Sequence, residues 1–293
     1  MAQLSRNQSF HRQILEGLVP KDVGEFILAT NGSNASKELV DAVYAHTEGN
    51  PFFMNEVIRL LVERGELGDG ASDGALIEGG ILALAVLQGV LEVIGQRLNR
   101  LSKECNDLLT TAAVIGRQFD FNLLEVLTEG VTELELLGTV EEALAAQVVQ
   151  ELPEAGDRYQ FSHALVQQTL LERLSTSRRV RLHARVGEAL ETLYEGRLAE
   201  HAGELAYHFE EAEPVAGPDK LVKYAILAGE RALEAYVHEE ALGHFERGLA
   251  AKGLAVEGAM PVLDPEAAAL LFGLGRAQVA TLGRQELDEA LGS

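Results

Sequence analysis

Apolar residues recur every three or four positions along most of the chain, which is the spacing of an amphipathic α-helix. In residues 103–115, for example, Leu108, Leu109, Ala112 and Ile115 form one apolar stripe. Residues that favour helix starts precede several such segments, among them Ser36, Asp120 and Thr132. The pattern therefore predicts a mainly α fold.

The first predicted region, residues 1–67, is a compact set of helices. Residues 47–51 contain Gly and Pro and interrupt the pattern, after which a helix is predicted over Phe52–Arg64. Residues 68–82 are rich in Gly, Asp and Ser, a composition typical of linkers. We therefore expect a helical subdomain followed by a connector.

A strand signal stands out in the middle of the chain. Residues 148–152 and 158–161 are two short runs with apolar alternation, and the turn-forming sequence 153–157 separates them. Three helices are predicted before this hairpin, and three helices followed by a hairpin are typical of a winged helix. We assign the predicted winged-helix domain to residues 83–176.

The remaining chain, residues 177–293, is a succession of amphipathic segments, which indicates an α-solenoid built from helix pairs. The predicted helices are Arg179–Tyr194, Leu198–Glu211, Lys220–Tyr236, Glu239–Lys252 and Pro265–Thr281.

The tetratricopeptide pattern can be aligned with two of these helices. It places Gly229, Ala241 and Gly248 at positions for small residues and Phe245 at the position for an aromatic residue. The segment after Leu287 is expected to be a helix without a partner, so we expect the natural array to continue beyond residue 293.

The charge of the chain argues against nucleic acid as a partner. The formal net charge is −22 at pH 7 and the pI is about 4.7, whereas phosphate binding depends on Lys and Arg. The helix predicted over Glu133–Ala146, which would read DNA in a winged helix, carries four Glu and no Lys or Arg. A cluster of arginines at residues 173–185 is interpreted as a solvated face or as ion pairs with acidic helices.

Two features predict a cytoplasmic protein without membrane contact. Cys105 is the only cysteine, which excludes an internal disulfide, and it is expected to be a buried structural thiol. The longest apolar run, Ile81–Leu87, is too short to cross a bilayer, and no signal peptide is recognisable.

No catalytic motif is recognisable, and no enzyme is expected. The phosphate-binding pattern G-x-x-x-x-G-K-[ST] does not occur. His201, Glu204 and His208 lie at i, i+3 and i+7 and could share one helix face, but acidic alternation explains the spacing equally well, so no metal site is assigned.

Five stretches in fixed order resemble the signal-transduction ATPases with numerous domains, in the branch that joins a P-loop ATPase to tetratricopeptide repeats. This branch includes LuxR-type transcriptional activators and cyclase-associated ATPases. The resemblance covers roughly residues 15–249. The stretches that carry it are residues 47–53 (TEGNPFF), 93–102 (VIGQRLNRLS), 112–119 (AAVIGRQF), 159–165 (YQFSHAL) and 178–183 (RRVRLH).

The resemblance implies nucleotide contacts for three residues when an ATPase core is present. Gly49 and Pro51 match the Gly-x-Pro turn of the helical lid, whose proline packs on the base. His163 matches the winged-helix histidine that reaches the diphosphate. A plain helix-breaking turn and a capping or core histidine remain open as alternatives. ATP or ADP with magnesium is the cofactor of the intact family, and this chain alone is expected to bind none.

The expected function is that of a regulatory fragment of such an ATPase, with a protein or small-molecule inducer on the repeats. The ATPase core and an effector domain are expected as further partners, with output through transcription or cyclase signalling. A P-loop encoded upstream in frame would make residue 1 a truncation point. One alternative is a stand-alone helical-repeat scaffold without nucleotide dependence. Another is an ATPase completed by a separate core chain.

Overall fold

The computed structural model describes residues 17–32, 35–63, 90–152, 156–254 and 264–292. The described residues are mainly helical, as the sequence predicts, and include one small sheet. They divide into two compact units, one within residues 1–102 and 162–169 and the other within 103–161 and 170–293. None of the described helices is both long and apolar enough to cross a membrane.

The first unit is a small helical body around an aliphatic and aromatic core. Ser36 caps a helix as predicted, since its hydroxyl accepts a hydrogen bond from the Leu39 N–H at 3.2 Å. The core side chains include Val23, Ile27, Val43, Phe53, Val57, Leu61 and Ile94. Its helices are α1 (Pro20–Asn31), α2 (Lys37–Thr47), α3 (Pro51–Glu63) and residues 90–98, with the start of α8 (Ala164–Glu172).

The second unit begins with three helices and three strands. The strands form an antiparallel sheet in the order β1-β3-β2. The elements are α5 (Lys103–Ile115), β1 (Gln118–Asp120), α6 (Phe121–Leu127), α7 (Glu133–Ala145), β2 (Val149–Glu151) and β3 (Arg158–Phe161).

The hairpin of β2 and β3 was predicted, but β1 was not. The sequence of β1 is Gln-Phe-Asp, with a single buried apolar residue, Phe119. Three residues carry too little alternation to mark a strand. Pairing with β3 and the rings of Tyr159 and Phe161, 6.0 and 5.4 Å from the Phe119 ring, hold this segment extended.

Two predicted helix caps are confirmed in this part. The Asp120 carboxylate accepts a hydrogen bond from the Asn122 N–H at 2.8 Å at the start of α6. At the start of α7, Thr132 and Glu135 form the reciprocal capping box, in which the Thr132 N–H donates to the Glu135 carboxylate at 2.9 Å.

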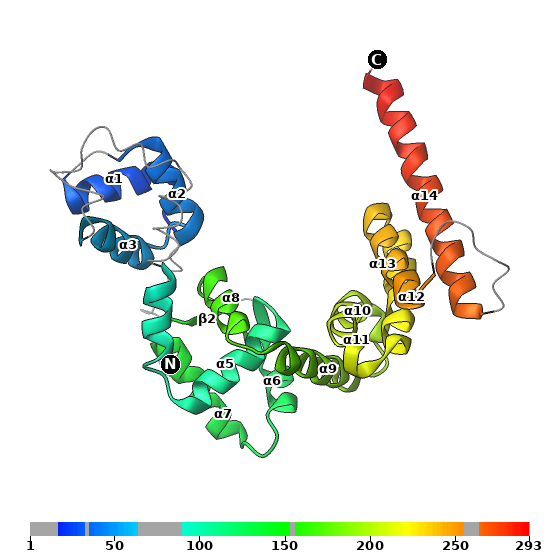
Figure 1. Ribbon diagram of the computed structural model, residues 1–293, viewed down its shortest axis with the longest axis horizontal. Helices are drawn as coiled ribbons and strands as arrows, with labels where there is room; N and C mark the ends of the chain where they lie inside the picture. Colours follow the sequence, from blue (N-terminus) through cyan, green and yellow to red (C-terminus); the bar gives the residue numbers. More distant parts are fainter. Residues whose placement is uncertain (1–16, 33–34, 64–89, 153–155, 255–263, 293) are drawn as a thin grey trace, which may run out of the picture. The chain divides into compact units, whose positions relative to one another are not determined.

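The rest of the second unit is a run of helices in which α12 packs against α10, α13 and α14 (Figure 1). One helix predicted over Leu198–Glu211 is divided, because its first turn is a 3₁₀-helix. The elements are α9 (Thr176–Leu193), η1 (Leu198–His201), α10 (Ala202–Glu211), α11 (Glu213–Ala216), α12 (Pro218–Glu234), α13 (His238–Ala251) and α14 (Pro265–Gly292).

Glycines let the helices of this run approach closely at two buried phenylalanines. A Cβ atom on Gly187 of α9 would lie 2.8 Å from the ring of Phe209 on α10. Cβ atoms on Gly229 and Gly273 would lie 2.6 and 2.3 Å from the ring of Phe245 on α13. Each ring occupies the space that a side chain would fill, so these helix pairs require glycine.

Candidate functional site

Gly49 lies in the turn between α2 and α3, where the chain can accept only glycine. Its φ is +70°, in the left-handed region. The Leu18 N–H donates a hydrogen bond to the Gly49 carbonyl at 2.8 Å, and a Cβ atom on Gly49 would lie 2.0 Å from the Leu18 carbonyl oxygen. The predicted turn is therefore present, and its glycine has a structural requirement of its own.

Pro51 is the first residue of α3, and its side chain is exposed. Proline suits the first turn of a helix because its fixed φ is helical and its missing N–H would have no partner there. The ring is therefore both a helix start and a surface that another molecule can reach. Two residues later, Phe53 points into the core with 1% of its surface exposed.

His163 comes two residues after the end of β3 and caps α8. The Leu165 N–H donates a hydrogen bond to His163 Nδ1 at 3.1 Å. Because Nδ1 accepts, the proton of the neutral ring is on Nε2. The side chain is buried, with 2% exposed, so the capping and core roles left open by the sequence both apply.

Phe53 joins the two predicted nucleotide contacts. Its ring lies edge-on to the His163 ring, with centroids 5.1 Å apart and an interplanar angle of 66°. The helix that begins at Pro51 therefore packs against His163 within one compact unit. An exposed apolar ring and an Nε2–H donor can contact a nucleotide base and a phosphate, provided that His163 becomes accessible.

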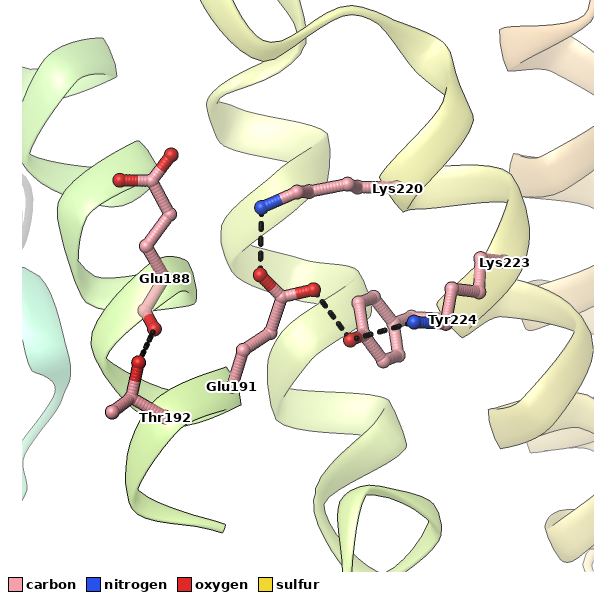
Figure 2. Close-up of polar contacts among 6 residues, drawn as sticks. All are labelled: Glu188, Glu191, Thr192, Lys220, Lys223 and Tyr224. Carbon is pink, nitrogen blue, oxygen red and sulfur yellow. Dashed lines mark hydrogen bonds and ion pairs between the residues drawn. The ribbon is translucent and has the colours of Figure 1, made fainter. Parts of the chain in front are cut away.

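A polar cluster joins α9 to α12 in the second unit (Figure 2). The Glu191 carboxylate accepts hydrogen bonds from Lys220 Nζ and from the Tyr224 hydroxyl, both at 2.6 Å. Burial raises the pKa of Glu191, but these two hydrogen bonds and the positive charges of Lys220 and Lys223 together outweigh it, so the pKa is lowered. Burial and the Glu191 carboxylate raise the pKa of Tyr224. The cluster braces two helices.

The three residues considered for a metal do not converge. His201 Nδ1 is 3.4 Å from a Glu204 carboxylate oxygen, but His208 Nδ1 is 3.0 Å from His183 Nδ1. Within the described ranges, no group of three or more His, Cys, Asp or Glu side chains has a metal-binding arrangement. Helical spacing alone could not predict that His208 faces α9.

His183 and His208 form a buried neutral pair. Burial, with Arg179 nearby, lowers the pKa of His183 to about 4. Burial and the neighbouring His183 lower the pKa of His208 to about 3. One Nδ1 must donate and the other accept across the 3.0 Å contact, which two charged rings cannot do.

Three of the five arginines in the cluster make ion pairs with acidic residues, as one of the two interpretations predicts. Arg178 pairs with Asp107 at 3.2 Å, and Arg179 pairs with Glu211 at 3.7 Å. Arg185 donates to the Leu127 carbonyl at 2.8 Å. These contacts connect α9 to α5, α10 and the end of α6.

Cys105 is buried on α5 with its sulfur 3.6 Å from the Thr139 carbonyl oxygen. Burial raises the pKa of its thiol to about 12, with the Glu142 carboxylate adding to the effect. A protonated, enclosed thiol is a poor nucleophile. The expected burial of Cys105 is confirmed.

A cleft of about 270 Å³ in the second unit was missed by sequence reasoning. Its walls come from η1 and the start of α10, the second half of α12 and the start of α13. Two of its lining residues, His201 and Glu204, stand out in the sequence, but only as candidates for a metal, and no spacing along the chain connects them to α12 and α13. The polar residues that line the cleft are Glu200, His201, Glu204, Arg231, Glu240 and His244.

A family model described as a domain of unknown function (DUF8739) matches residues 32–67, which include α2, α3 and the Gly49 turn. No curated protein and no solved structure shows significant similarity to the chain.

Proposed function

We propose that the chain is the regulatory part of a multidomain signal-transduction ATPase. The observation that carries the proposal is the contact of Phe53, on the helix that begins at Pro51, with His163. It joins the two segments that would hold the base and the phosphates of a nucleotide bound to an ATPase core. Residues 1–67 would be the helical lid of that ATPase.

The arrangement of residues 103–161 supports a winged helix within the predicted domain of residues 83–176. The order α5, β1, α6, α7, β2, β3 with sheet order β1-β3-β2 is the order expected of a winged helix and supports this assignment. Its third helix, α7, has acidic residues in its first turn and no basic residue in its last turn. We therefore assign this domain to packing and switching and not to reading DNA.

The helix pairs from α9 to α14 support a tetratricopeptide-like array. Gly229 and Gly248 are buried at close helix contacts, and Phe245 fills the space between α12 and α14. An inducer bound to these repeats would favour one state of the switch, and ADP on the core would favour another. The output would be transcription or cyclase signalling through an effector domain.

The chain alone is proposed to be no enzyme, since it contains no phosphate-binding loop. Isothermal titration with magnesium and ATP is expected to give no saturable binding below the millimolar range. Micromolar affinity would contradict this part of the proposal.

The nucleotide contact is tested in the full-length gene product that carries these residues behind a P-loop core. His163→Ala should weaken ADP binding about 10- to 100-fold, the loss of one hydrogen bond to a charged group. His46→Ala, on α2, is the matched control and should leave the affinity unchanged. Equal ADP affinity of the two variants, or a gene product without a P-loop core, would refute the proposal.

The second candidate is a helical-repeat scaffold without nucleotide dependence. The local roles of Gly49, Pro51 and His163 favour it, because turn, helix start and cap explain all three residues without a nucleotide. Unchanged ADP affinity in the test above would select this function.

A further inference from the structure

The cleft between η1, α10, α12 and α13 combines both signs of charge around small apolar side chains. Glu200, Glu204 and Glu240 supply carboxylates, and Arg231 supplies a guanidinium group. Within the described residues Arg231 makes no ion pair, although acidic residues outnumber basic ones by 46 to 24. The apolar part of the lining is Ala228, Ala232, Ala235 and Val237.

His244 is the buried polar group of the cleft wall. Only 5% of its surface is exposed. An Arg247 nitrogen donates to Nδ1 at 3.1 Å, and because arginine has no acceptor, the proton of the neutral ring must be on Nε2. On the other side of the ring, Nε2 lies 3.6 Å from a carboxylate oxygen of Glu240, which also lines the cleft.

Gly203 leaves the edge of this ring open. A Cβ atom on Gly203 would lie 3.8 Å from His244 Cε1 and 3.9 Å from Nε2, which is ordinary van der Waals contact. Alanine would therefore be accommodated, whereas a longer side chain would occupy the cleft. The His244 Nε2–H can therefore donate to a ligand that enters the cleft beside Glu240.

We propose that this cleft binds a free amino acid with an aliphatic side chain. The carboxylates of Glu200, Glu204 and Glu240 would surround its ammonium group. The Arg231 guanidinium would donate to its carboxylate, which gives this cation an anionic partner, and the His244 Nε2–H would be a second donor to the same carboxylate. The alanines and Val237 would contact its side chain.

The alternatives in ligand chemistry leave part of the lining unused. A simple amine would use the carboxylates but would leave Arg231 without an anionic partner. A simple carboxylate would meet three carboxylates. The cleft is also smaller than the roughly 300–1,000 Å³ typical of sites for drug-sized ligands, so a small molecule fits it better.

If the chain is the regulatory part of an ATPase, the bound amino acid would be its inducer, and this role rests on the proposed function. The binding of the amino acid to the cleft does not. Binding is measured on the 293-residue chain without nucleotide. Its failure would leave the ADP measurement on His163→Ala unaffected, and failure of that measurement would leave the binding result standing.

The test is isothermal titration of the chain with L-leucine at pH 7 and constant ionic strength. The matched half-ligands are isopentylamine, which lacks the carboxylate, and 4-methylpentanoate, which lacks the ammonium group. Saturable binding of L-leucine is expected, with each half-ligand at least about tenfold weaker, the loss of one charged interaction. L-Valine should bind and L-glutamate should not.

Four variants locate the site. Gly203→Leu should abolish binding, and Gly138→Leu, at an exposed helix position with nothing within 4 Å of its Cβ, should not. Arg231→Gln and Glu240→Gln should each weaken binding about tenfold. If the circular dichroism spectrum shows that Gly203→Leu is not folded like the wild type, the binding measured for Arg231→Gln and Glu240→Gln decides whether the cleft is the site.

Three outcomes would overturn the inference. The first is no saturable binding of L-leucine or L-valine at millimolar concentration. The second is an affinity for isopentylamine equal to that for L-leucine. The third is wild-type affinity for L-leucine in both single variants, Arg231→Gln and Glu240→Gln.

Discussion

The helix pairs α9–α10 and α12–α13 use the same dipeptide for different purposes. His208-Phe209 lies on α10 and His244-Phe245 on α13, and in both the phenylalanine packs over a glycine of the preceding long helix. The histidines differ. His208 is sealed against His183, whereas His244 bonds to Arg247 and forms part of a cleft wall.

The difference separates what packing requires from what it leaves free. The ring of Phe245 is enclosed by Gly229 and Gly273, and the ring of Phe209 by Gly187, so the aromatic position is fixed in both pairs. The histidine before each phenylalanine is not fixed by this packing, and its partner is His183 for His208 and Arg247 for His244. The same packing of phenylalanine on glycine therefore leaves one neighbouring histidine, His208, in a buried histidine pair and the other, His244, as a donor in a cleft wall.

Among the substitutions that test this comparison, truncation of the two phenylalanines should lower the free energy of unfolding the most. Phe209→Ala and Phe245→Ala should each lower the free energy of unfolding by about 3–5 kcal/mol, because a large buried ring leaves a cavity. We expect the greater loss at Phe245, which α12 and α14 both contact. Urea denaturation followed by circular dichroism measures it, with Phe272→Ala, 69% exposed, as the control. A smaller loss at Phe245 than at Phe272 would contradict the shared packing unit.

Filling the glycines should come next in magnitude. Gly187→Ala and Gly229→Ala place a methyl group 2.8 and 2.6 Å from a phenylalanine ring carbon. Overpacking of this kind costs about 1–3 kcal/mol. Gly138→Ala, on the exposed surface of α7, should instead stabilise the protein by up to about 1 kcal/mol, since alanine favours helix. Equal effects at all three positions would show that the close contacts are not required.

The sealed histidine pair should make folding sensitive to acid. The pKa values of His183 and His208 are lowered to about 4 and about 3 in the folded protein, so folding favours their neutral forms. Their contribution to stability is therefore full above the unfolded pKa of about 6.5 and is lost as the pH falls toward the folded values. Between pH 6.5 and 5.5 the loss is about 1 kcal/mol per histidine.

The measurement is the urea denaturation of wild type and of His183→Gln with His208→Gln across this pH range. The double variant should show a shallower decrease. Parallel pH curves for the two proteins would indicate that the pair is not the source of the acid sensitivity.

The smallest expected effect is at the polar cluster of Glu191, Lys220 and Tyr224, which connects α9 of one helix pair to α12 of the other. Tyr224→Phe removes the hydroxyl that donates to Glu191 but keeps the ring that stacks on Phe209, with centroids 5.6 Å apart. The expected loss is about 0.5–1.5 kcal/mol, the net value of one hydrogen bond. Thermal unfolding should shift by a few degrees. A loss comparable to that of Phe209→Ala would mean that the Glu191 cluster, and not the phenylalanine, holds the pairs together.

The sequence predicted the elements that local chemistry specifies. The capping box at Thr132, the cap at Asp120 and the hairpin ending at Phe161 all depend on residues within a few positions of one another, and the structure confirms them. Strand β1 was missed because its stability depends on pairing with β3, about 40 residues away in the sequence. The 3₁₀ turn at η1 was missed because helical spacing does not distinguish it from an α-helix.

For the candidate sites, the sequence could indicate positions but not neighbours. Gly49, Pro51 and His163 were identified from short motifs, and the turn and the cap are where those motifs predict. The contact of Phe53 with His163 crosses more than 100 residues, and no local pattern encodes it. The cleft joins residues from η1, α10, α12 and α13, so its lining could not be predicted from spacing along any one helix.

The sequence by itself determined the helical character, the caps, the hairpin and the presence of close helix pairs, because propensity and apolar period act over a few residues. Only the tertiary structure decided that His208 would meet His183 and that His244 would meet a cleft. The two histidines occupy equivalent positions beside a packed phenylalanine. Their contacts differ because the neighbours of a side chain are determined by the helices that pack around it.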